Sequence, residues 1–284
     1  MRDPRTECAP LGVFDSGLGG LTVVHAVRRL LPNENLIYLG DTARVPYGTR
    51  SPDTVVKYAR SCARMLVSRG VKALIVACNT VSAVALDVLR AELDLPVIGV
   101  VEPGASAAIE VMSKLPVSGL QPLPRIGVLG TAGTIASGAY SRAVSRINTR
   151  MEVVGQAAPL LVPLVEEGWV EGEVPELAVR RYVTPLIEQG ARVLVLGCTH
   201  YPLLRGMIER VAADIAGEVV PVIDGAVATA AVVGQLLQSG RVEARTSPGV
   251  GEVQLFVTDL PASFKCMAQR FLGESLPDVT QIDI

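Results

Sequence analysis

The chain has 284 residues, of which 49% are hydrophobic and 19% are charged, and its formal net charge is −2. This length is sufficient for two modest domains, and the near-neutral charge gives no electrostatic reason to expect nucleic acid or a membrane as a partner. The five cysteines are an odd number without a CxxC motif, which argues against a disulfide framework, and two histidines are too few for a zinc cluster.

The N-terminal residues 1–10 contain four charged side chains and no apolar core, so they do not have the pattern of a signal peptide. The apolar runs elsewhere have the length of single strands, which is too short to span a bilayer. We therefore expect a protein of the reducing cytoplasm, where free thiols stay available for reaction.

Strands and helices alternate along the first 115 residues. The expected strands are 11–14, 36–39, 71–76 and 96–101, and the expected helices are 21–31, 53–69, 82–93 and 105–114. Ser51 is a candidate N-cap for the second of these helices, with Pro52 at its first position. Alternation of this kind favours parallel sheets that carry helices on both faces.

The pattern restarts after residues 115–124, which contain three prolines and a glycine and form the clearest domain boundary. The expected strands after it are 125–130, 151–155, 193–196, 219–223 and 252–257, the expected helices are 175–189, 202–213 and 225–239, and 163–168 is a loop or a short helix. Asp15 precedes Cys78 by 63 residues and Gly130 precedes Cys198 by 68, so strand, turn and thiol repeat in both halves.

This repeat predicts an α/β fold with two pseudo-symmetric lobes, each a mainly parallel sheet flanked by helices, and a site in the cleft between them. We expect the chain to pass into the second lobe and return. The first lobe would then comprise residues 10–103 and 214–284, and the second lobe residues 104–213.

The glycine-rich turn 15–20 follows the first strand and precedes a helix, as phosphate-binding loops do. Its glycines, Gly17, Gly19 and Gly20, match neither the GxGxxG nor the Walker spacing. The alternative is that the amides of the turn and the start of the helix hold a carboxylate.

Cys78 and Cys198 each follow an apolar strand and a small residue, and each precedes a pair of polar residues. A single cysteine in such a place is usually a small buried hydrophobe. Two copies in matching contexts, each eight residues after a glycine, are harder to explain as core packing. Because open α/β sheets bind ligands beyond the carboxyl ends of their strands, we expect one thiol on each side of a ligand.

Thiols on opposite sides of one carbon suit a reaction that removes a proton from one face and returns one to the other, which is racemisation or epimerisation. The thiolate is the working base, and a free thiol near pKa 8.5 is mostly protonated at neutral pH, so each thiol needs a helper. Asp15 could assist Cys78 and His200 could assist Cys198, although Asp15 could equally be an N-cap and His200 a satisfied buried histidine.

Pyridoxal phosphate would require a Schiff-base lysine, and none of the four lysines follows a strand end or lies in a glycine-rich loop. We therefore expect a reaction without a cofactor and without a metal. Backbone and hydroxyl donors would stabilise the charge that develops on the substrate.

The motifs around the turn and the two thiols resemble those of glutamate racemases, in the aspartate/glutamate racemase superfamily. They are Gly12–Val23, Asp41 with Pro46-Tyr47-Gly48, Ala77–Ala83 and Gly197–Leu204, and the likeness extends from Leu11 to about Leu237. The sequence Cys198-Thr199-His200 is typical of glutamate racemases, whereas aspartate racemases usually carry Cys-Thr-Glu at this place.

The resemblance implies interconversion of L- and D-glutamate without a cofactor, and a supply of D-glutamate for peptidoglycan. It implies that Cys78 and Cys198 are the acid/base thiols and that Asp15 and His200 are their helpers. The substrate contacts that we expect are Asp15, Ser16, Pro46, Tyr47, Gly48, Asn79, Thr80, Thr131, Thr134, Glu166, Thr199 and His200. For Glu166 the alternative is a solvated loop carboxylate.

Gly225 is a departure, because the family commonly has serine there and a hydroxyl is lost. Residues before Pro10 form an extra tail, and after Leu237 we expect a structural role only. The competing functions are a related racemase or decarboxylase acting on aspartate, hydantoin or another acid, and a binding protein without activity. The sequence gives no oligomeric state and leaves a homodimer open.

Overall fold

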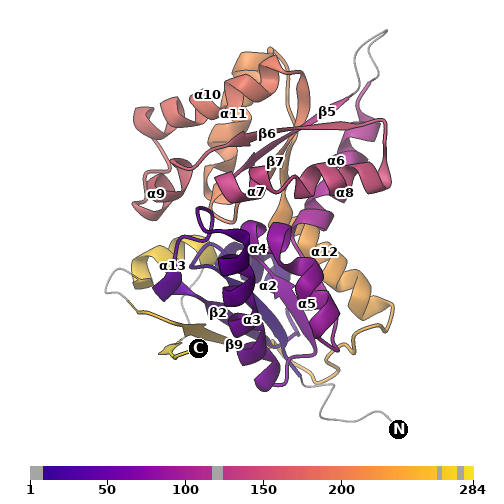
Figure 1. The fold of residues 1–284 in the computed structure, drawn as a ribbon, viewed down its shortest axis with the longest axis vertical. Coiled ribbons are helices and arrows are strands. Elements are labelled where there is room, and N and C mark those ends of the chain that lie inside the picture. Colours follow the sequence, from indigo (N-terminus) through magenta and orange to yellow (C-terminus); the bar gives the residue numbers. More distant parts are fainter. Residues whose placement is uncertain (1–8, 117–123, 261–263, 274–277) are drawn as a thin grey trace.

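The computed structural model describes residues 9–116, 124–260, 264–273 and 278–284. It contains two α/β lobes, each built on its own sheet, and Figure 1 shows one lobe above the other with the earliest part of the chain in the lower lobe. Every strand pairing among these residues is parallel. The α/β class and the two-lobed arrangement expected from the sequence are therefore confirmed.

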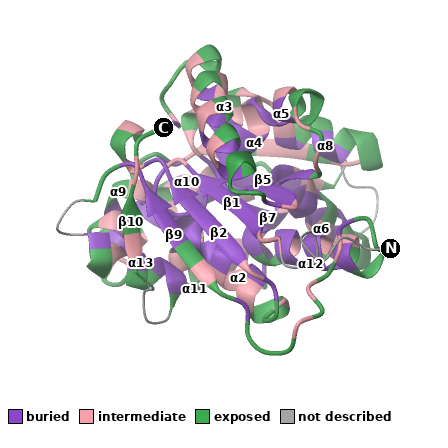
Figure 2. Cartoon of the chain, turned by 90° about the horizontal axis from the view of Figure 1, so that it is seen from below, coloured by how far each residue is buried: buried purple, intermediate pink, exposed green. Residues whose placement is uncertain are grey.

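The first sheet has six strands among the described residues. They are β1 (Leu11–Asp15), β2 (Leu36–Gly40), β3 (Ala73–Val76), β4 (Val97–Gly99), β9 (Val253–Val257) and β10 (Val279–Gln281). Their order across the sheet is β10-β9-β2-β1-β3-β4. Strands β1, β2 and β3 are buried along their whole length, because helices cover both faces of a parallel sheet. Figure 2 shows this for β1 and β2.

The second sheet has four strands in the order β6-β5-β7-β8. Their bounds are β5 (Arg125–Gly130), β6 (Glu152–Ala157), β7 (Ala191–Gly197) and β8 (Val222–Asp224). Strand β7 lies between β5 and β8 and is almost entirely buried, which agrees with its continuous apolar sequence.

The helices connect successive strands and cover the sheets. They are α2 (Leu21–Leu30), α3 (Pro52–Ser68), α4 (Asn79–Val84), α5 (Leu86–Glu92), α6 (Val101–Lys114), α7 (Ala132–Ala136), α8 (Ala139–Ile147), α9 (Leu161–Glu166), α10 (Glu173–Glu188), α11 (Arg205–Ala216), α12 (Gly225–Gln238) and α13 (Phe264–Leu272), with 3₁₀ turns η1 (Thr42–Arg44) and η2 (Tyr201–Leu204). Ser51 occupies the N-cap position of α3 and Pro52 its first position, as expected, although the Ser51 hydroxyl bonds to the Thr54 hydroxyl (3.0 Å) instead of a backbone amide.

Neighbouring side chains of β1 point to opposite faces of the first sheet and enter different cores. Phe14 belongs to a cluster with Leu66 of α3, which is confined to the first lobe. Val13 belongs to a second cluster that also contains Leu129 and Leu194 of the second lobe. The two lobes therefore share one continuous hydrophobic core.

The second lobe extends further along the chain than the sequence predicts. The expected range ended at residue 213, but β8 pairs with β7 in the second sheet, with Leu196 opposite Asp224. We therefore place the return to the first lobe after Asp224, where α12 begins and packs against α2 and α6. The sequence of the short strand 219–223 does not indicate which of the two sheets it joins, because the pairing of a strand depends on long-range packing.

Several further elements differ from the prediction. The helix expected at 82–93 is divided into α4 and α5 at Ala85, and it begins three residues earlier, directly after Cys78. Helices α7, α8 and α13 and strand β10 were not predicted at all, and α6 begins four residues before the expected start at 105. The tail before Pro10, with Cys8, lies mostly outside the described residues, as does most of the boundary segment 115–124.

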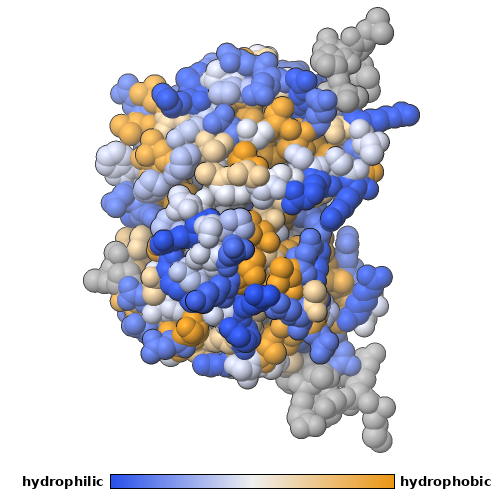
Figure 3. Space-filling model, viewed as in Figure 1, coloured by the Kyte–Doolittle hydropathy of each residue, from blue (hydrophilic) through white to orange (hydrophobic). Residues whose placement is uncertain are grey.

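Hydrophobic and hydrophilic residues are mixed on the face of the molecule shown in Figure 3, with hydrophobic residues in small separate groups. Among the helices that the structure describes, none is both long enough and apolar enough to cross a bilayer.

Candidate active site

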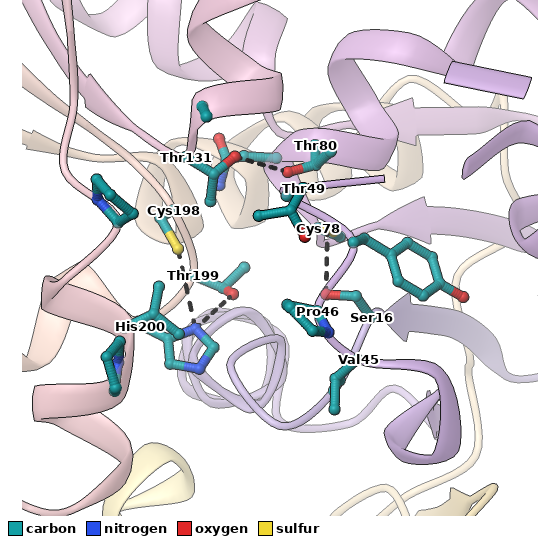
Figure 4. Close-up of a pocket in the computed structure, with 18 of the residues that line it drawn as sticks. Ser16, Val45, Pro46, Thr49, Cys78, Thr80, Thr131, Cys198, Thr199 and His200 are labelled. Atoms are coloured by element: carbon teal, nitrogen blue, oxygen red, sulfur yellow. Dashed lines mark hydrogen bonds between the residues drawn. The ribbon is translucent and has the colours of Figure 1, made fainter. Parts of the chain in front are cut away.

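A cavity of about 320 Å³ lies where the carboxyl ends of β1 and β3 face those of β5 and β7. This is the edge at which open parallel sheets bind their ligands. Its wall is formed by Ser16, Gly17, Val45, Pro46, Tyr47, Gly48, Thr49, Cys78, Asn79, Thr80, Thr131, Ala132, Pro159, Val162, Pro163, Glu166, Cys198, Thr199 and His200. Figure 4 shows Cys78 and Cys198 on opposite sides of this space.

Cys78 follows β3 and occupies the N-cap position of α4. Its thiol is 6% exposed and donates to the hydroxyl oxygen of Ser16 over 3.4 Å. Burial, followed by the charge of Asp15, raises the pKa of the Cys78 thiol to about 12, while the bonds to Ser16 and to the backbone of Val81 act in the opposite direction. The surroundings of Cys78 thus favour the protonated thiol.

Cys198 follows β7 on the other side of the cavity, with its Sγ 3.9 Å from Nδ1 of His200. The other ring nitrogen of His200, Nε2, lies 3.0 Å from Oε1 of Glu166. Burial lowers the pKa of His200, but the bonds to Cys198 and Glu166 outweigh it and raise this pKa to about 10. The site therefore favours an imidazolium at His200, with its Nδ1 facing the sulfur of Cys198.

Asp15 lies behind Ser16 and does not form part of the cavity wall. It is 1% exposed, and its Oδ2 accepts from the amide of Gly17 over 3.0 Å, while its Oδ1 has no hydrogen-bond partner among the described residues. Burial raises the pKa of Asp15, against the opposing effects of His200 and of the amides of Gly20, Gly17 and Ser16. Asp15 can act on Cys78 through its charge, and Ser16 is the residue that bonds to the thiol.

The loop between η1 and α3 supplies Val45, Pro46, Tyr47, Gly48 and Thr49 to the wall. Its conformation is fixed from behind by Asp41, which is fully buried. Asp41 accepts from the Tyr47 hydroxyl, from Nε of Arg44 (2.6 Å) and from the hydroxyl of Thr258 (2.9 Å). The end of β9 therefore helps to hold this loop.

Three threonine hydroxyls join the two lobes at the edge of the cavity. The Oγ1 atoms of Thr80 and Thr131 are 2.9 Å apart, and that of Thr134 lies 3.3 Å from Thr80 and 3.0 Å from Thr131. Thr134 is 1% exposed and lies behind Thr131, outside the wall, whereas Thr80 and Thr131 line it. The structure thus brings every predicted site residue into the wall except Asp15 and Thr134.

Sequence reasoning missed α13, which belongs to the first lobe but contacts the histidine side of the cavity. The ring of Phe271 meets His200 edge-on, with centroids 5.0 Å apart, and Arg270 donates to the backbone oxygen of Glu166 over 3.2 Å. The apolar spacing of residues 264–272 could have indicated a helix. Its contact with His200 depends on tertiary packing and has no local signal.

Among the described residues, the wall contains no lysine or arginine, so apart from His200 a carboxylate substrate would be held by neutral donors. Ser16, Thr49, Thr80, Thr131 and Thr199 offer hydroxyl groups, and Asn79 offers an amide. Among the described residues, no group of three or more His, Cys, Asp or Glu side chains could hold a metal ion. The arrangement is suited to binding a small anion between two thiols.

The chain matches the Asp/Glu/Hydantoin racemase family over residues 21–233. A glutamate racemase of Geobacter metallireducens is 49% identical over 274 residues, which cover 96% of each chain. Among solved structures, a glutamate racemase isoform of Bacillus anthracis has a TM-score of 0.88 and 36% identity, covering 98% of both chains. The glutamate racemase of Francisella tularensis in complex with D-glutamate has a TM-score of 0.86 and 34% identity, also over 98% of both chains.

Proposed function

The chain belongs to the Asp/Glu/Hydantoin racemase family, and we propose that it interconverts L-glutamate and D-glutamate by proton transfer at Cα without a cofactor. The observation that carries the proposal is the position of Cys78 and Cys198 on opposite sides of one cavity. Relatives named as glutamate racemases, one of them with bound D-glutamate, support glutamate as the substrate.

In the L-to-D direction, the Cys198 thiolate takes the proton from Cα and the Cys78 thiol returns its own proton to the opposite face. The products are D-glutamate, a Cys198 thiol and a Cys78 thiolate, so no proton or electron is lost. The reverse reaction begins from this second protonation state, with Cys78 as the base. The burial that favours a protonated thiol at Cys78 supports its role as the proton donor in this direction.

The neutral donors in the wall would serve the two carboxylates of glutamate and the negative charge that develops when Cα loses its proton. Because these donors come from both lobes, the substrate would be held at the junction between them. A cavity of about 320 Å³ is near the lower end of small-molecule sites and suits a small amino acid.

We further propose that the D-glutamate supplies peptidoglycan synthesis, as the family resemblance implies, and that the reaction takes place in the cytoplasm. A reducing compartment would keep Cys78 and Cys198 as free thiols, the state in which the structure has them.

The function is tested by incubating the chain with L-glutamate, L-aspartate and hydantoins separately and following optical activity by circular dichroism. We expect loss of signal with L-glutamate alone, and incorporation of deuterium at Cα of glutamate in heavy water. Racemisation of aspartate or a hydantoin in place of glutamate would assign a different substrate within the family. Binding without exchange at Cα would assign a non-enzymatic role.

A further inference from the structure

Tyr140 joins the segments that carry the two thiols. It lies in the first turn of α8 in the second lobe, is 3% exposed, and donates its hydroxyl to Oδ1 of Asn79 in the first lobe over 2.8 Å. Asn79 directly follows Cys78 and lines the cavity. The Tyr140 ring also lies against Gly197, the residue before Cys198: a Cβ at that glycine would be 3.4 Å from the ring.

The hydrogen bond has a defined direction. Burial raises the pKa of Tyr140 above its ordinary value, so the phenol stays protonated and can donate. A side-chain amide has one acceptor end and one donor end, and a donor at Oδ1 leaves the two N–H groups of Nδ2 for other partners. Among the described residues, the structure gives Nδ2 no acceptor that would compete with a ligand.

The orientation of this amide matters because, among the described residues, the cavity wall has no lysine or arginine and His200 lies on the side of Cys198. A carboxylate requires donors, and Asn79 is the wall's side-chain amide. If the amide were reversed, its carbonyl oxygen would face the anion and repel it. The phenol oxygen could accept from a reversed amide, but the buried phenol proton would then have no acceptor among the described residues, so the hydroxyl of Tyr140 disfavours this reversal.

We propose that Tyr140 is a positioning residue that fixes the amide of Asn79 with its N–H donors toward a carboxylate of the substrate. This inference rests on the proposed function, since it takes a carboxylate as the ligand. Tyr140 touches neither the substrate nor a reacting atom, and it acts through Asn79. The bond crosses the junction, so it also ties the orientation of this donor to the second lobe.

The test is Tyr140→Phe, which removes the hydroxyl and keeps the ring against Gly197. A hydrogen bond of this kind contributes about 1 kcal/mol, so KM should rise about fivefold for both enantiomers while kcat changes little. The dissociation constant of D-glutamate, measured by calorimetry, should rise by a similar factor. The fall in kcat/KM must be the same in both directions, because the two enantiomers have equal free energy, so with kcat little changed the rise in KM should be similar for both.

Tyr201→Phe is the matched control, because the buried hydroxyl of Tyr201 also makes a 2.8 Å bond, to the backbone oxygen of Ala158 within the second lobe. It should lower the thermal midpoint as much as Tyr140→Phe without the same rise in KM. In a double-mutant cycle, Tyr140→Phe should add little to the KM of Asn79→Ala, because the hydroxyl then has no amide to orient.

An unchanged KM and dissociation constant in Tyr140→Phe would overturn the inference, as would a loss confined to kcat. Additive effects in the cycle would also overturn it, since they would show that Tyr140 supports the fold independently of Asn79. Failure of the proposed function gives a different result: the wild-type chain would not racemise glutamate. Because calorimetry needs no turnover, the role of Tyr140 in carboxylate binding can still be measured in that case.

Discussion

Nε2 of His200 lies 3.0 Å from Oε1 of Glu166, so a carboxylate holds the imidazole from the side opposite Cys198. The two residues differ in exposure: the His200 side chain is 9% exposed and that of Glu166 is 43% exposed. Water can therefore reach the carboxylate while the ring remains buried. This pair gives Glu166, for which the sequence left a solvated loop position open, a partner in the site.

Glu166→Gln should shift the pH dependence of the L-to-D reaction. The pKa of His200 is raised to about 10 because its bonds to Cys198 and Glu166 outweigh burial, so the wild-type imidazolium persists to high pH. Loss of the Glu166 charge lowers this pKa, and the alkaline fall in kcat for L-glutamate should move to lower pH. The measurement is a pH profile of kcat for each variant.

Glu167→Gln is the control for this experiment, because Glu167 is adjacent and exposed. Its profile should match that of the wild type. Identical alkaline limbs in the pH profiles of Glu166→Gln and the wild type would contradict the proposed influence of Glu166.

The raised pKa of His200 also affects the stability of the fold. Because the folded-state pKa is raised from 6.5, protonation of His200 stabilises the fold fully below about pH 6.5, and this contribution is lost as the pH rises through about 10.

Cys78→Ala and Cys198→Ala should each abolish racemisation while leaving the chain folded. Each variant removes one of the two groups that exchange a proton with Cα, and water or a neighbouring hydroxyl is a poor substitute for a thiolate base. Cys266→Ala is the matched control, since Cys266 is an exposed free thiol outside the cavity wall. Near-wild-type turnover in either active-site variant would contradict the two-thiol mechanism.

Phe271→Leu should slow the reaction by loosening the orientation of His200. The substitution keeps an apolar side chain in a position that is 4% exposed, but it removes the edge-on ring contact with the imidazole. Such aromatic contacts contribute about 0.5–1.5 kcal/mol, so we expect kcat with L-glutamate to fall about two- to tenfold. Steady-state kinetics by circular dichroism measures this.

Phe264→Leu controls for the loss of a buried ring from the same helix. Phe264 is 1% exposed and belongs to the same hydrophobic cluster as Phe271. Phe264→Leu should lower the thermal midpoint of unfolding without a fall in kcat comparable to that of Phe271→Leu. Equal effects of the two substitutions on kcat would assign α13 a general structural role.

The local pattern of the sequence was sufficient to find both thiols and the parallel sheets. Cys78 and Cys198 were identified because each follows a continuous apolar run, and burial on both faces produces such runs in parallel strands. The residues that directly follow each thiol in the chain were predicted to line the site for this reason, and they do line the cavity. The observed cavity contains twelve of the fourteen predicted site residues, and the two exceptions, Asp15 and Thr134, lie directly behind it.

What the sequence could not give depends on contacts between distant segments. Phe271 and His200 are 71 residues apart and meet only because α13 packs against α2 beside the second lobe. Tyr140 and Asn79 meet across the junction of the lobes. The sheet that contains β8 was also assigned wrongly, since a three-residue strand carries no information about its partner.

Asp15→Asn and His200→Asn should each slow the reaction without abolishing it, and each should act on one thiol. Through its charge Asp15 raises the pKa of Cys78, whereas His200 contacts Cys198 directly. A proton-transfer helper typically contributes about 10²–10⁴-fold, so both variants should retain measurable activity. In the proposed mechanism Cys78 takes the proton from D-glutamate and Cys198 takes it from L-glutamate.

The primary isotope effect with Cα-deuterated glutamate, measured in each direction, separates the two assignments. Weakening one helper makes proton abstraction by its own thiol more rate-limiting, so His200→Asn should raise the isotope effect chiefly from L-glutamate and Asp15→Asn chiefly from D-glutamate. The values of kcat/KM in the two directions must still agree, because the enantiomers have equal free energy. The asymmetry must therefore appear in the isotope effects, or in kcat and KM taken separately. Equal changes in both directions for both variants would exclude one helper per thiol and would leave the two-thiol mechanism in place.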